Sequence, residues 1–493
     1  MTYQLDRQSE VPIPEQIATA IEEMIRARAW RIGERIPSIR ASAKSFGVSA
    51  TTVAQAYTFL EAKGAIEAKP RSGYYVRRWN DPVDLVPGPS RSMLPLEPHQ
   101  VRPLRMLGHM EQARARADMV ELGNALPTES LLPHEELARA MGRVLRRSTR
   151  RFVAIEGPQG AIDLRRELSR NLLELGLAVT PDELFVTTGA TEALHLALRA
   201  VARKGDVIAL ESPAYYGFFQ SLGVFEMRTL ELPCDARDGM DTDALEEALV
   251  RGVPVRAVLT CPAVSNPLGA TLTMERGKHL VNLAREYDFT IIEDMTYSDL
   301  CFDEQGRRAL DTQQEDVRII RYGSFSKSLA PGFRLGWCVP GEYESRFRAA
   351  KVTTTMSTPT ITQLAAAEFM RQGTYARCVE ELREVFEVKT TWLREHIAQT
   401  FPEGTRLSNP AGGHVLWLEL PGGINTSELF ERCVQQGVSF APGELFSNSD
   451  AFRSCLRINV ALDWDERNLD ALAVIETESK AMLATSSKRL ANS

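Results

Sequence analysis

The sequence lacks the features that mark exported, membrane-spanning or cysteine-stabilised proteins. No apolar run approaches the roughly 18 residues that a membrane-spanning helix needs. The N-terminal stretch MTYQLDRQSEVPIPEQ contains no apolar signal core, so we do not expect export. The seven cysteines are scattered without a CxxC pair, which argues against a zinc cluster and a disulfide framework. We therefore expect a cytoplasmic protein with no metal site.

The sequence also has little net charge, but that charge is unevenly distributed. Residues 1–79 hold 12 Lys and Arg against 8 Asp and Glu, a balance of +4. Because the whole chain has a net charge of −7, the remaining residues carry −11. A basic first segment on an acidic remainder is typical of a chain that meets nucleic acid only through its beginning. The length of 493 residues indicates two or three domains.

The pattern of residues 1–79 predicts three helices and a hairpin. A first helix begins at Pro14 with apolar residues on one face, and Ser38 is placed to cap a short second helix. Gly47 turns the chain, and Ser49 caps a third helix whose Val53, Ala56, Tyr57 and Leu60 face inward. The stretch AIEAKPRSGYYV then predicts two short strands. Such a helix pair followed by a hairpin can enter the major groove of DNA.

The remainder divides into a proline-rich linker and a large α/β domain. Six prolines fall within residues 80–104, which predicts a semi-rigid linker before a domain spanning 105–493. From about 119 to 350 short β-branched strands alternate with helices, which indicates a mostly parallel sheet covered on both faces. Residues of about 351–480 are first helical and then contain the strands HVLWLEL and CLRINVA, which predicts a smaller α+β lobe.

The first segment resembles the GntR family of regulators. The stretch PSIRASAKSFGVSATTVAQAYTFLEAKGAIEAKPRSGYYV carries the Pro-Ser-x-Arg start, the Gly-Val-Ser turn and the Gly-Tyr-Tyr-Val wing of that family. The resemblance implies a winged helix-turn-helix that binds a double-stranded DNA operator. The implied DNA-binding residues are Arg40, Ser49, Thr51, Thr52, Gln55, Lys69 and Arg71. Ala50 stands where relatives often carry Arg, so strong guanine reading is not expected there. The alternative is a small helical cap whose charges are only solvated.

The large domain contains the side chains that pyridoxal phosphate chemistry needs. A lysine must form the Schiff base, a carboxylate must keep the pyridine nitrogen protonated, and donors must hold a dianionic phosphate. Lys327 lies in SFSKSLAPGFRLGW, with Ser324 and Ser326 before it and Arg334 after it. Asp294 ends an apolar strand, which places its carboxylate at the ligand edge of an α/β sheet.

These residues occur in the chain order of the fold-type I aminotransferases, which the domain resembles over residues 119–475. The resemblance implies a phosphate cup at Gly189, Ala190 and Thr191, where a helix begins after a strand. It further implies Tyr215 as the ring-stacking aromatic, Asn266 and Tyr297 as partners of the ring hydroxyl, and Arg457 as the fork for a substrate carboxylate. Lys327, Asp294 and Tyr297 would be catalytic, and Asn266 would also face the substrate.

Each of these residues also has a plainer interpretation. Asn266-Pro267 can be a simple turn, Arg457 a surface strand residue and Tyr216 a core residue. His195 and His414 have no evident role, and we interpret both as structural. One position departs from the family: Ile155 precedes the GPQG turn where relatives often carry a tyrosine that reaches the partner subunit's phosphate, and Phe152 is the nearest aromatic.

A winged helix joined to an aminotransferase-like domain is the architecture of the MocR subgroup of GntR regulators. That resemblance implies a head-to-tail homodimer. The favoured hypothesis is a regulator in which an amino compound, or pyridoxal phosphate itself, is sensed through the Schiff base at Lys327. The alternative is an active aminotransferase with an accessory DNA-binding domain, because the same residues serve both functions.

Overall fold

The computed structural model describes residues 12–26, 30, 34–62, 65–69, 72–76, 88–90, 94–102, 105–147, 150–151, 153–311 and 317–491. The chain divides into two compact units, residues 1–85 and 86–493. None of the described helices is both long and apolar enough to span a membrane.

The smaller unit has the predicted three helices and hairpin. The helices are α1 (Ile13–Arg26), α2 (Ile39–Phe46) and α3 (Ala50–Ala62), and the strands β1 (Ile66–Lys69) and β2 (Gly73–Val76) pair antiparallel. Ser38 caps α2, and its side chain accepts a hydrogen bond from the Ala41 N–H. Gly47 ends α2 at a φ of 66°, a left-handed conformation that glycine adopts without strain.

The third helix forms the centre of the smaller unit's core. Val53, Ala56, Tyr57 and Leu60 are all fully buried, as the spacing predicts. They pack with apolar residues of α1 and with Ile66 of β1. The Tyr57 hydroxyl donates a hydrogen bond of 2.6 Å to the Pro37 carbonyl oxygen, so the residue that anchors α3 also fixes the start of α2.

The larger unit is built on a nine-stranded, mostly parallel sheet. The strand order is β3-β7-β6-β9-β10-β11-β12-β5, with β8 on β7. Strands β7, β6, β9, β10 and β11 run parallel to one another, whereas β3, β8, β12 and β5 pair antiparallel. The strands are β3 (His99–Gln100), β5 (Phe185–Thr187), β6 (Val207–Ser212), β7 (Arg228–Asp235), β8 (Gly239–Met240), β9 (Val255–Thr260), β10 (Thr290–Asp294), β11 (Ile319–Ser324) and β12 (Gly336–Val339).

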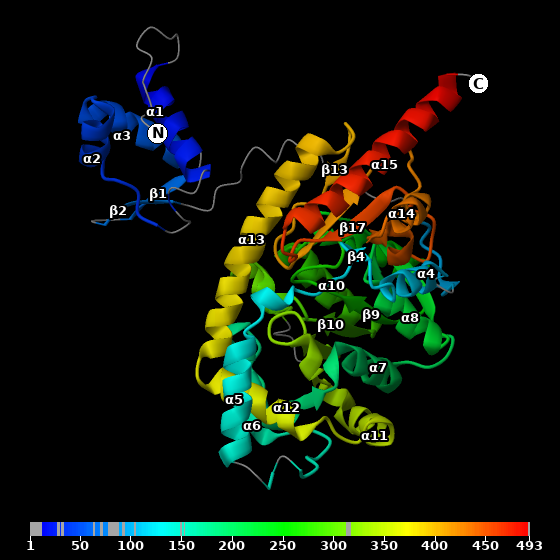
Figure 1. Ribbon diagram of the computed structural model, residues 1–493. Helices are drawn as coiled ribbons and strands as arrows, with labels where there is room; N and C mark the ends of the chain where they lie inside the picture. Colours follow the sequence, from blue (N-terminus) through cyan, green and yellow to red (C-terminus); the bar gives the residue numbers. More distant parts are fainter. Residues whose placement is uncertain are drawn as a thin grey trace. The chain divides into compact units, whose positions relative to one another are not determined.

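Helices cover both faces of this sheet because its strands are apolar on both sides. Ile208 of β6 packs with one set of helices, which includes α7 (Gly189–Val201), α8 (Tyr216–Val224) and α11 (Glu344–Thr354). The neighbouring Val207 packs with a second set on the other face, which includes α4 (Arg105–Arg114), α9 (Thr242–Val250) and α10 (Met274–Tyr287). In Figure 1, β9 and β10 accordingly lie between α10 and α7.

A smaller lobe follows, as the sequence predicts. Its antiparallel sheet has the order β13-β14-β17-β16, and β15 pairs parallel with β4. Its strands are β13 (Arg406–Leu407), β14 (Val415–Glu419), β15 (Val438–Ser439), β16 (Ala441–Pro442), β17 (Cys455–Asn459) and β4 (Val120–Glu121). The remaining helices are α5 (His134–Arg147), α6 (Ile162–Glu174), α12 (Thr360–Arg371), α13 (Thr374–Thr400), α14 (Thr426–Gln435) and α15 (Glu466–Ala491).

The described part of the proline-rich segment packs on the larger unit. His99 and Gln100 add the edge strand β3 to β7, and the Arg102 N–H donates to the Asn448 side chain at 2.6 Å. Ser90 donates from its backbone N–H and its hydroxyl to Glu419. Residues 88–102 therefore belong to this unit where they are described, although their composition predicts only a linker. Prolines are compatible with this because an edge strand needs only one paired side.

Candidate cofactor and DNA-binding sites

The predicted cofactor residues meet where the carboxyl ends of the parallel strands approach the smaller lobe. Asp294 is the last residue of β10, and Lys327 follows the end of β11. Gly189 begins α7 directly after β5, and Arg457 lies on β17 of the smaller lobe. The charges of Asp294, Arg334 and Arg457 all act on Lys327, so residues far apart in the sequence share one site.

Lys327 has an unusually low affinity for protons. Removal from water and the positive charges of Arg457 and Arg334 lower the pKa of its amine to about 7, while Asp294 acts in the opposite direction. Its Nζ donates a 2.6 Å hydrogen bond to the Ala125 carbonyl oxygen. At a pKa of about 7, roughly half of the amine is unprotonated at pH 7, and the unprotonated form can act as the nucleophile that covalent capture of an aldehyde requires.

Asp294 is buried and held in a fixed orientation. Burial raises the pKa of its carboxyl, but hydrogen bonds from Thr296 and Tyr322 and the charge of Lys327 oppose that shift. The Thr296 N–H donates to one carboxylate oxygen at 2.8 Å, and the Tyr322 hydroxyl donates to the other at 2.8 Å. This carboxylate is therefore suited to pair with a protonated ring nitrogen.

The amino-acid end of the site contains buried polar atoms for which the described residues supply no partner. Arg457 is fully buried, which excludes the plainer interpretation of a surface strand residue. Its guanidinium donates to the Asn266 amide oxygen at 2.9 Å and to the Gly123 carbonyl oxygen at 2.7 Å. The Arg457 Nε and the Tyr297 hydroxyl have no hydrogen-bond partner among the described residues. Such orphaned groups are rare in native structures and fit a site that binds a polar ligand.

The phosphate end of the site is more open. Arg334 and Thr191 are exposed, whereas Gly189 and Ser326 are buried. Gly189 has a φ of 80°, and a Cβ placed there would lie 2.8 Å from the Arg334 guanidinium. The same guanidinium donates to the Ser326 hydroxyl at 3.3 Å, and the Ser324 hydroxyl accepts the Ser326 N–H. The start of α7, with half-buried Ala190, thus lies beside one arginine, an arrangement suited to a dianion.

Tyr215 lies within the same group of charges. Removal from water raises the pKa of its hydroxyl to about 12, and the charges of Arg457, Asp294 and Arg334 also act on it. Its ring contacts Tyr216 and Phe218, with centroids 4.7 and 5.6 Å apart. Tyr215 is only partly buried, which is compatible with stacking on a ligand ring.

Two residues of this site escape sequence reasoning. Tyr322 of β11 reads as an ordinary apolar strand position, but its hydroxyl orients Asp294. His414 precedes β14, and its ring centroid lies 5.6 Å from that of Tyr297. The signal for Tyr322 is the alternation of side chains along β11, which ends at the site, whereas His414 lies before its strand and depends on a contact with the distant Asn459. His195, by contrast, is paired with the Ser221 hydroxyl at 3.0 Å.

The predicted DNA-binding side chains lie on the surface of the smaller unit, except Arg71, which lies outside the described residues. Arg40, Thr51, Gln55 and Lys69 are exposed. The Ser49 hydroxyl accepts the Thr52 N–H at 3.1 Å, so Ser49 caps α3 as well as facing solvent. Lys69 lies over the ring of Tyr75 on the hairpin.

The loop expected to carry a cross-subunit aromatic is exposed. Ile155 is 76% accessible and Val153 is 73% accessible, which is unusual for such apolar side chains. Phe152 lies outside the described residues. Two exposed apolar side chains, Val153 and Ile155, therefore lie in the loop where relatives often carry the cross-subunit tyrosine.

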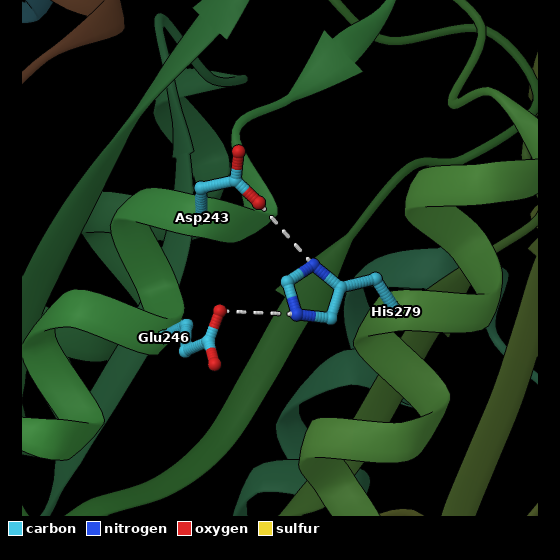
Figure 2. A group of neighbouring side chains, drawn as sticks. All are labelled: Asp243, Glu246 and His279. Atoms are coloured by element: carbon cyan, nitrogen blue, oxygen red, sulfur yellow. Dashed lines mark ion pairs between the residues drawn. The ribbon is translucent and has the colours of Figure 1, made fainter.

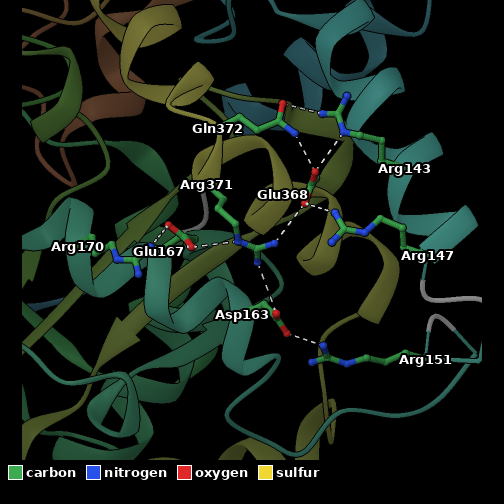
Figure 3. A network of polar contacts seen from close by, with 9 residues as sticks. All are labelled: Arg143, Arg147, Arg151, Asp163, Glu167, Arg170, Glu368, Arg371 and Gln372. Atoms are coloured by element: carbon green, nitrogen blue, oxygen red, sulfur yellow. Dashed lines mark hydrogen bonds and ion pairs between the residues drawn. The ribbon is translucent and has the colours of Figure 1, made fainter.

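Two further charged clusters are explained by pairing within the chain. Asp243 and Glu246 approach different ring nitrogens of His279, at 3.4 and 3.3 Å (Figure 2), so the imidazole bridges two carboxylates. A hollow of about 230 Å³ between α5, α6 and α12 is lined by paired charges. Every arginine drawn in Figure 3 has a carboxylate partner; the residues are Arg143, Arg147, Arg151, Arg170 and Arg371 with Asp163, Glu167 and Glu368.

Comparison with known proteins agrees with both units. Residues 13–76 match the bacterial regulatory proteins of the gntR family, and residues 118–475 match the class I and II aminotransferases. The chain is 32% identical to the HTH-type transcriptional regulator YjiR of Escherichia coli, over 94% of this chain and 97% of that protein. It is 31% identical to YdcR of the same organism, over 93% and 97% of the two chains.

A solved structure extends the likeness to the larger unit. Kynurenine aminotransferase of Pyrococcus horikoshii, determined in complex with PMP, matches with a TM-score of 0.71 and 27% identity. The match covers 78% of this chain and 95% of that one.

Proposed function

Because this chain belongs to the HTH-type transcriptional regulators that join a GntR domain to a class I and II aminotransferase domain, we propose that its larger unit senses an amino compound and thereby controls DNA binding. The observation that carries the proposal is the buried fork of Arg457 beside the Lys327 amine, whose pKa is lowered to about 7. One group suits a carboxylate, and the other suits an aldehyde or amine.

Pyridoxal phosphate fits the residues of this site. Lys327 would hold its aldehyde carbon as a Schiff base, Asp294 its ring nitrogen, and Tyr297 and Asn266 its ring hydroxyl. Arg334, Ser324, Ser326 and the start of α7 at Gly189–Thr191 would hold its phosphate, with Tyr215 against its ring. When bound, the cofactor supplies an electron-withdrawing ring and a carbonyl carbon that exchanges amines. The unpartnered Tyr297 hydroxyl is the observation that fits this group best.

The residues of the chain perform distinct tasks in this scheme. Arg457 binds and orients the carboxylate of the amino compound, and burial excludes water from that ion pair. Lys327 accepts or releases a proton at Nζ near neutral pH. Tyr322 keeps the Asp294 carboxylate in place at 2.8 Å. The free energy of these contacts would favour one conformation of the protein over another.

In a head-to-tail homodimer, the smaller unit of each copy would bind one of the two half-sites of an operator. The exposed Thr51 and Gln55 and the half-buried Thr52 of α3 suit the major groove, and Arg40, Lys69 and Arg71 suit the phosphate backbone. The exposed pair Val153 and Ile155 supports an interface of the larger unit with a second copy. Linkage then requires that the amino compound and DNA change each other's affinity by the same factor.

A second candidate function is transamination with an accessory DNA-binding unit. The low pKa of Lys327 favours transamination, because an amine whose pKa is near neutral pH can accept and release the proton that this reaction must move. The two functions share every residue of the site, so only measurement of turnover separates them.

The experiment combines cofactor absorbance with DNA retention. The purified chain, loaded with pyridoxal phosphate, is titrated with single amino acids while its absorbance band and the mobility of DNA from upstream of its own gene are recorded. Sensing predicts a shifted band and altered DNA retention without release of keto acid. Steady keto-acid release would instead favour transamination.

Two variants make the outcome specific. Lys327→Ala should abolish the band, whereas Lys278→Ala, which removes an exposed lysine on α10, should leave it unchanged. A band that persists in Lys327→Ala would refute the assignment of that lysine. DNA retention that no amino acid alters would refute sensing.

A further inference from the structure

His414 is a buried histidine that the scheme above does not use. It follows Gly412 and Gly413 and precedes β14, and none of its surface is accessible. Its carbonyl oxygen accepts the Val460 N–H at 2.7 Å, which fixes its backbone beside β17. The ring packs against those of Tyr297 and Phe386, with centroids 5.6 and 5.2 Å away, so the imidazole is also held at the edge of the site.

The hydrogen bonds around Asn459 determine which imidazole nitrogen carries the proton. The Asn459 amide nitrogen donates to the Asn124 side chain and to the Leu126 carbonyl oxygen, each at 2.8 Å. Its amide oxygen accepts the Ala461 N–H at 2.9 Å and faces His414 Nδ1 at 3.3 Å. Because that oxygen can only accept, Nδ1 carries the hydrogen and Nε2 carries a lone pair.

The Nε2 lone pair has no partner in the part of the chain that the structure describes. Among the described residues no donor reaches it, although the atom is fully buried. Burial and the positive charges of Lys327 and Arg457 lower the pKa of His414 to about 3, so the ring stays neutral and Nε2 stays an acceptor at physiological pH. A buried acceptor without a donor is unfavourable by itself, which points to a donor that arrives with a ligand.

The position of His414 relates it to the amino compound. Arg457 and Asn459 are two residues apart on β17, so their side chains project from the same face of that strand. His414 contacts Asn459 on that face. The ring of His414 also contacts Tyr297, with centroids 5.6 Å apart. The free acceptor therefore lies in the group that holds the carboxylate and the ring hydroxyl.

We propose that His414 Nε2 determines specificity by accepting a hydrogen bond from a side-chain N–H or O–H donor of the amino compound held by Arg457. The inference rests on the proposed function, because it assumes that Arg457 binds the carboxylate. It assigns the sensed compounds to amino acids with a hydroxyl, amide or ammonium group in the side chain. Apolar amino acids of the same size leave the acceptor unpaired and bind more weakly.

The test uses pairs of amino acids of nearly equal size that differ in one donor. L-threonine is compared with L-valine, and L-glutamine with L-methionine, by titrating the cofactor absorbance band of the full chain. We expect the amino acid that carries the donor to bind at least about 10-fold more tightly than its apolar counterpart in one pair or both. His414→Phe and His414→Met remove the acceptor and should reduce that ratio to below about 3 without loss of the cofactor band.

Two further variants separate recognition from structure. His414→Gln keeps an acceptor oxygen and should retain part of the preference, whereas a merely structural histidine would gain nothing from this choice. His195→Phe, at a histidine paired with Ser221, should leave the preference intact. If His414→Phe does not fold, the Met and Gln variants decide the question by the same ratio.

The outcomes are distinguishable. A wild-type chain that binds both members of every pair equally, or a preference that survives in both His414→Phe and His414→Met, overturns the inference alone. A wild-type chain whose band responds to no amino acid overturns the proposed sensing function, and this inference with it.

Discussion

Replacement of Lys351 by methionine should destabilise the larger unit markedly and in a pH-dependent way. Lys351 lies on α11 with none of its surface accessible, and its Nζ is 3.2 Å from both carboxylate oxygens of Glu192. Glu192, in the first turn of α7, accepts the Thr188 N–H at 2.5 Å. The pair therefore supports the turn that forms the phosphate end of the site.

The magnitude follows from the group that the substitution leaves behind. Lys351→Met keeps the length of the side chain but leaves a carboxylate, only 9% exposed, without its cation. Breaking a buried ion pair in this way costs about 3–5 kcal/mol. Protonation of the carboxylate left without its cation limits the loss of stability. For a glutamate with the reference pKa of model peptides, protonation costs about 3.7 kcal/mol at pH 7 and about 1 kcal/mol at pH 5. We therefore expect a loss of about 3–4 kcal/mol at pH 7 that falls to about 1 kcal/mol at pH 5.

Urea unfolding followed by circular dichroism and tryptophan fluorescence at both pH values measures this loss. The double variant Lys351→Met/Glu192→Gln should recover to within about 1 kcal/mol of the wild type, because it leaves no buried charge. Lys278→Met, at an exposed position on α10, should change stability by less than about 0.5 kcal/mol. A loss below about 1 kcal/mol at pH 7, an equal loss at pH 5, or a double variant no better than the single one would refute the reasoning.

Three other predictions concern the cofactor and DNA. The rate at which the cofactor-free chain captures pyridoxal phosphate, followed by absorbance, should rise with pH to a midpoint near 7, because the Lys327 amine must lose its proton and its pKa is lowered to about 7; a midpoint near 10 would contradict this. Tyr322→Phe should weaken cofactor binding about 10- to 100-fold in an absorbance titration, since it removes a 2.8 Å hydrogen bond to the Asp294 carboxylate; unchanged affinity would show that this bond is dispensable. Lys69→Ala should lower the slope of log affinity for DNA against log salt by about 1, whereas Gln55→Ala should alter sequence preference at the same slope; equal effects of the two on slope would exclude the assigned roles.

Much of the fold could be predicted because its local signals agree with its packing. The helices of the smaller unit follow from Ser38, Gly47 and the buried spacing of Val53 to Leu60, all of which the structure confirms. The parallel sheet follows from strands that are apolar on both faces. The order of the cofactor residues along the chain allowed their common site to be predicted, and the fold brings Lys327, Asp294 and Arg457 into one group of interacting charges.

What could not be predicted depends on contacts between distant segments. Nothing in the sequence around Gly123 to Leu126 indicates that its carbonyl oxygens face Arg457, Lys327 and Asn459. His414 reads as a structural residue because its role depends on the orientation of the Asn459 amide, 45 residues away in the sequence. The packing of residues 88–102 is equally hidden, since their prolines dominate the local pattern while Glu231 and Asn448 anchor them.

The distribution of cysteines has a practical consequence. All seven thiols are buried and unpaired, at positions 234, 261, 301, 338, 378, 433 and 455, and burial raises the pKa of each. Folded chains should thus react slowly with thiol reagents and oxidants. A single cysteine introduced at Thr58, an exposed residue of α3 outside the proposed DNA contacts, could then be labelled selectively, so that a fluorophore on α3 reports the DNA-bound state without removal of any native thiol.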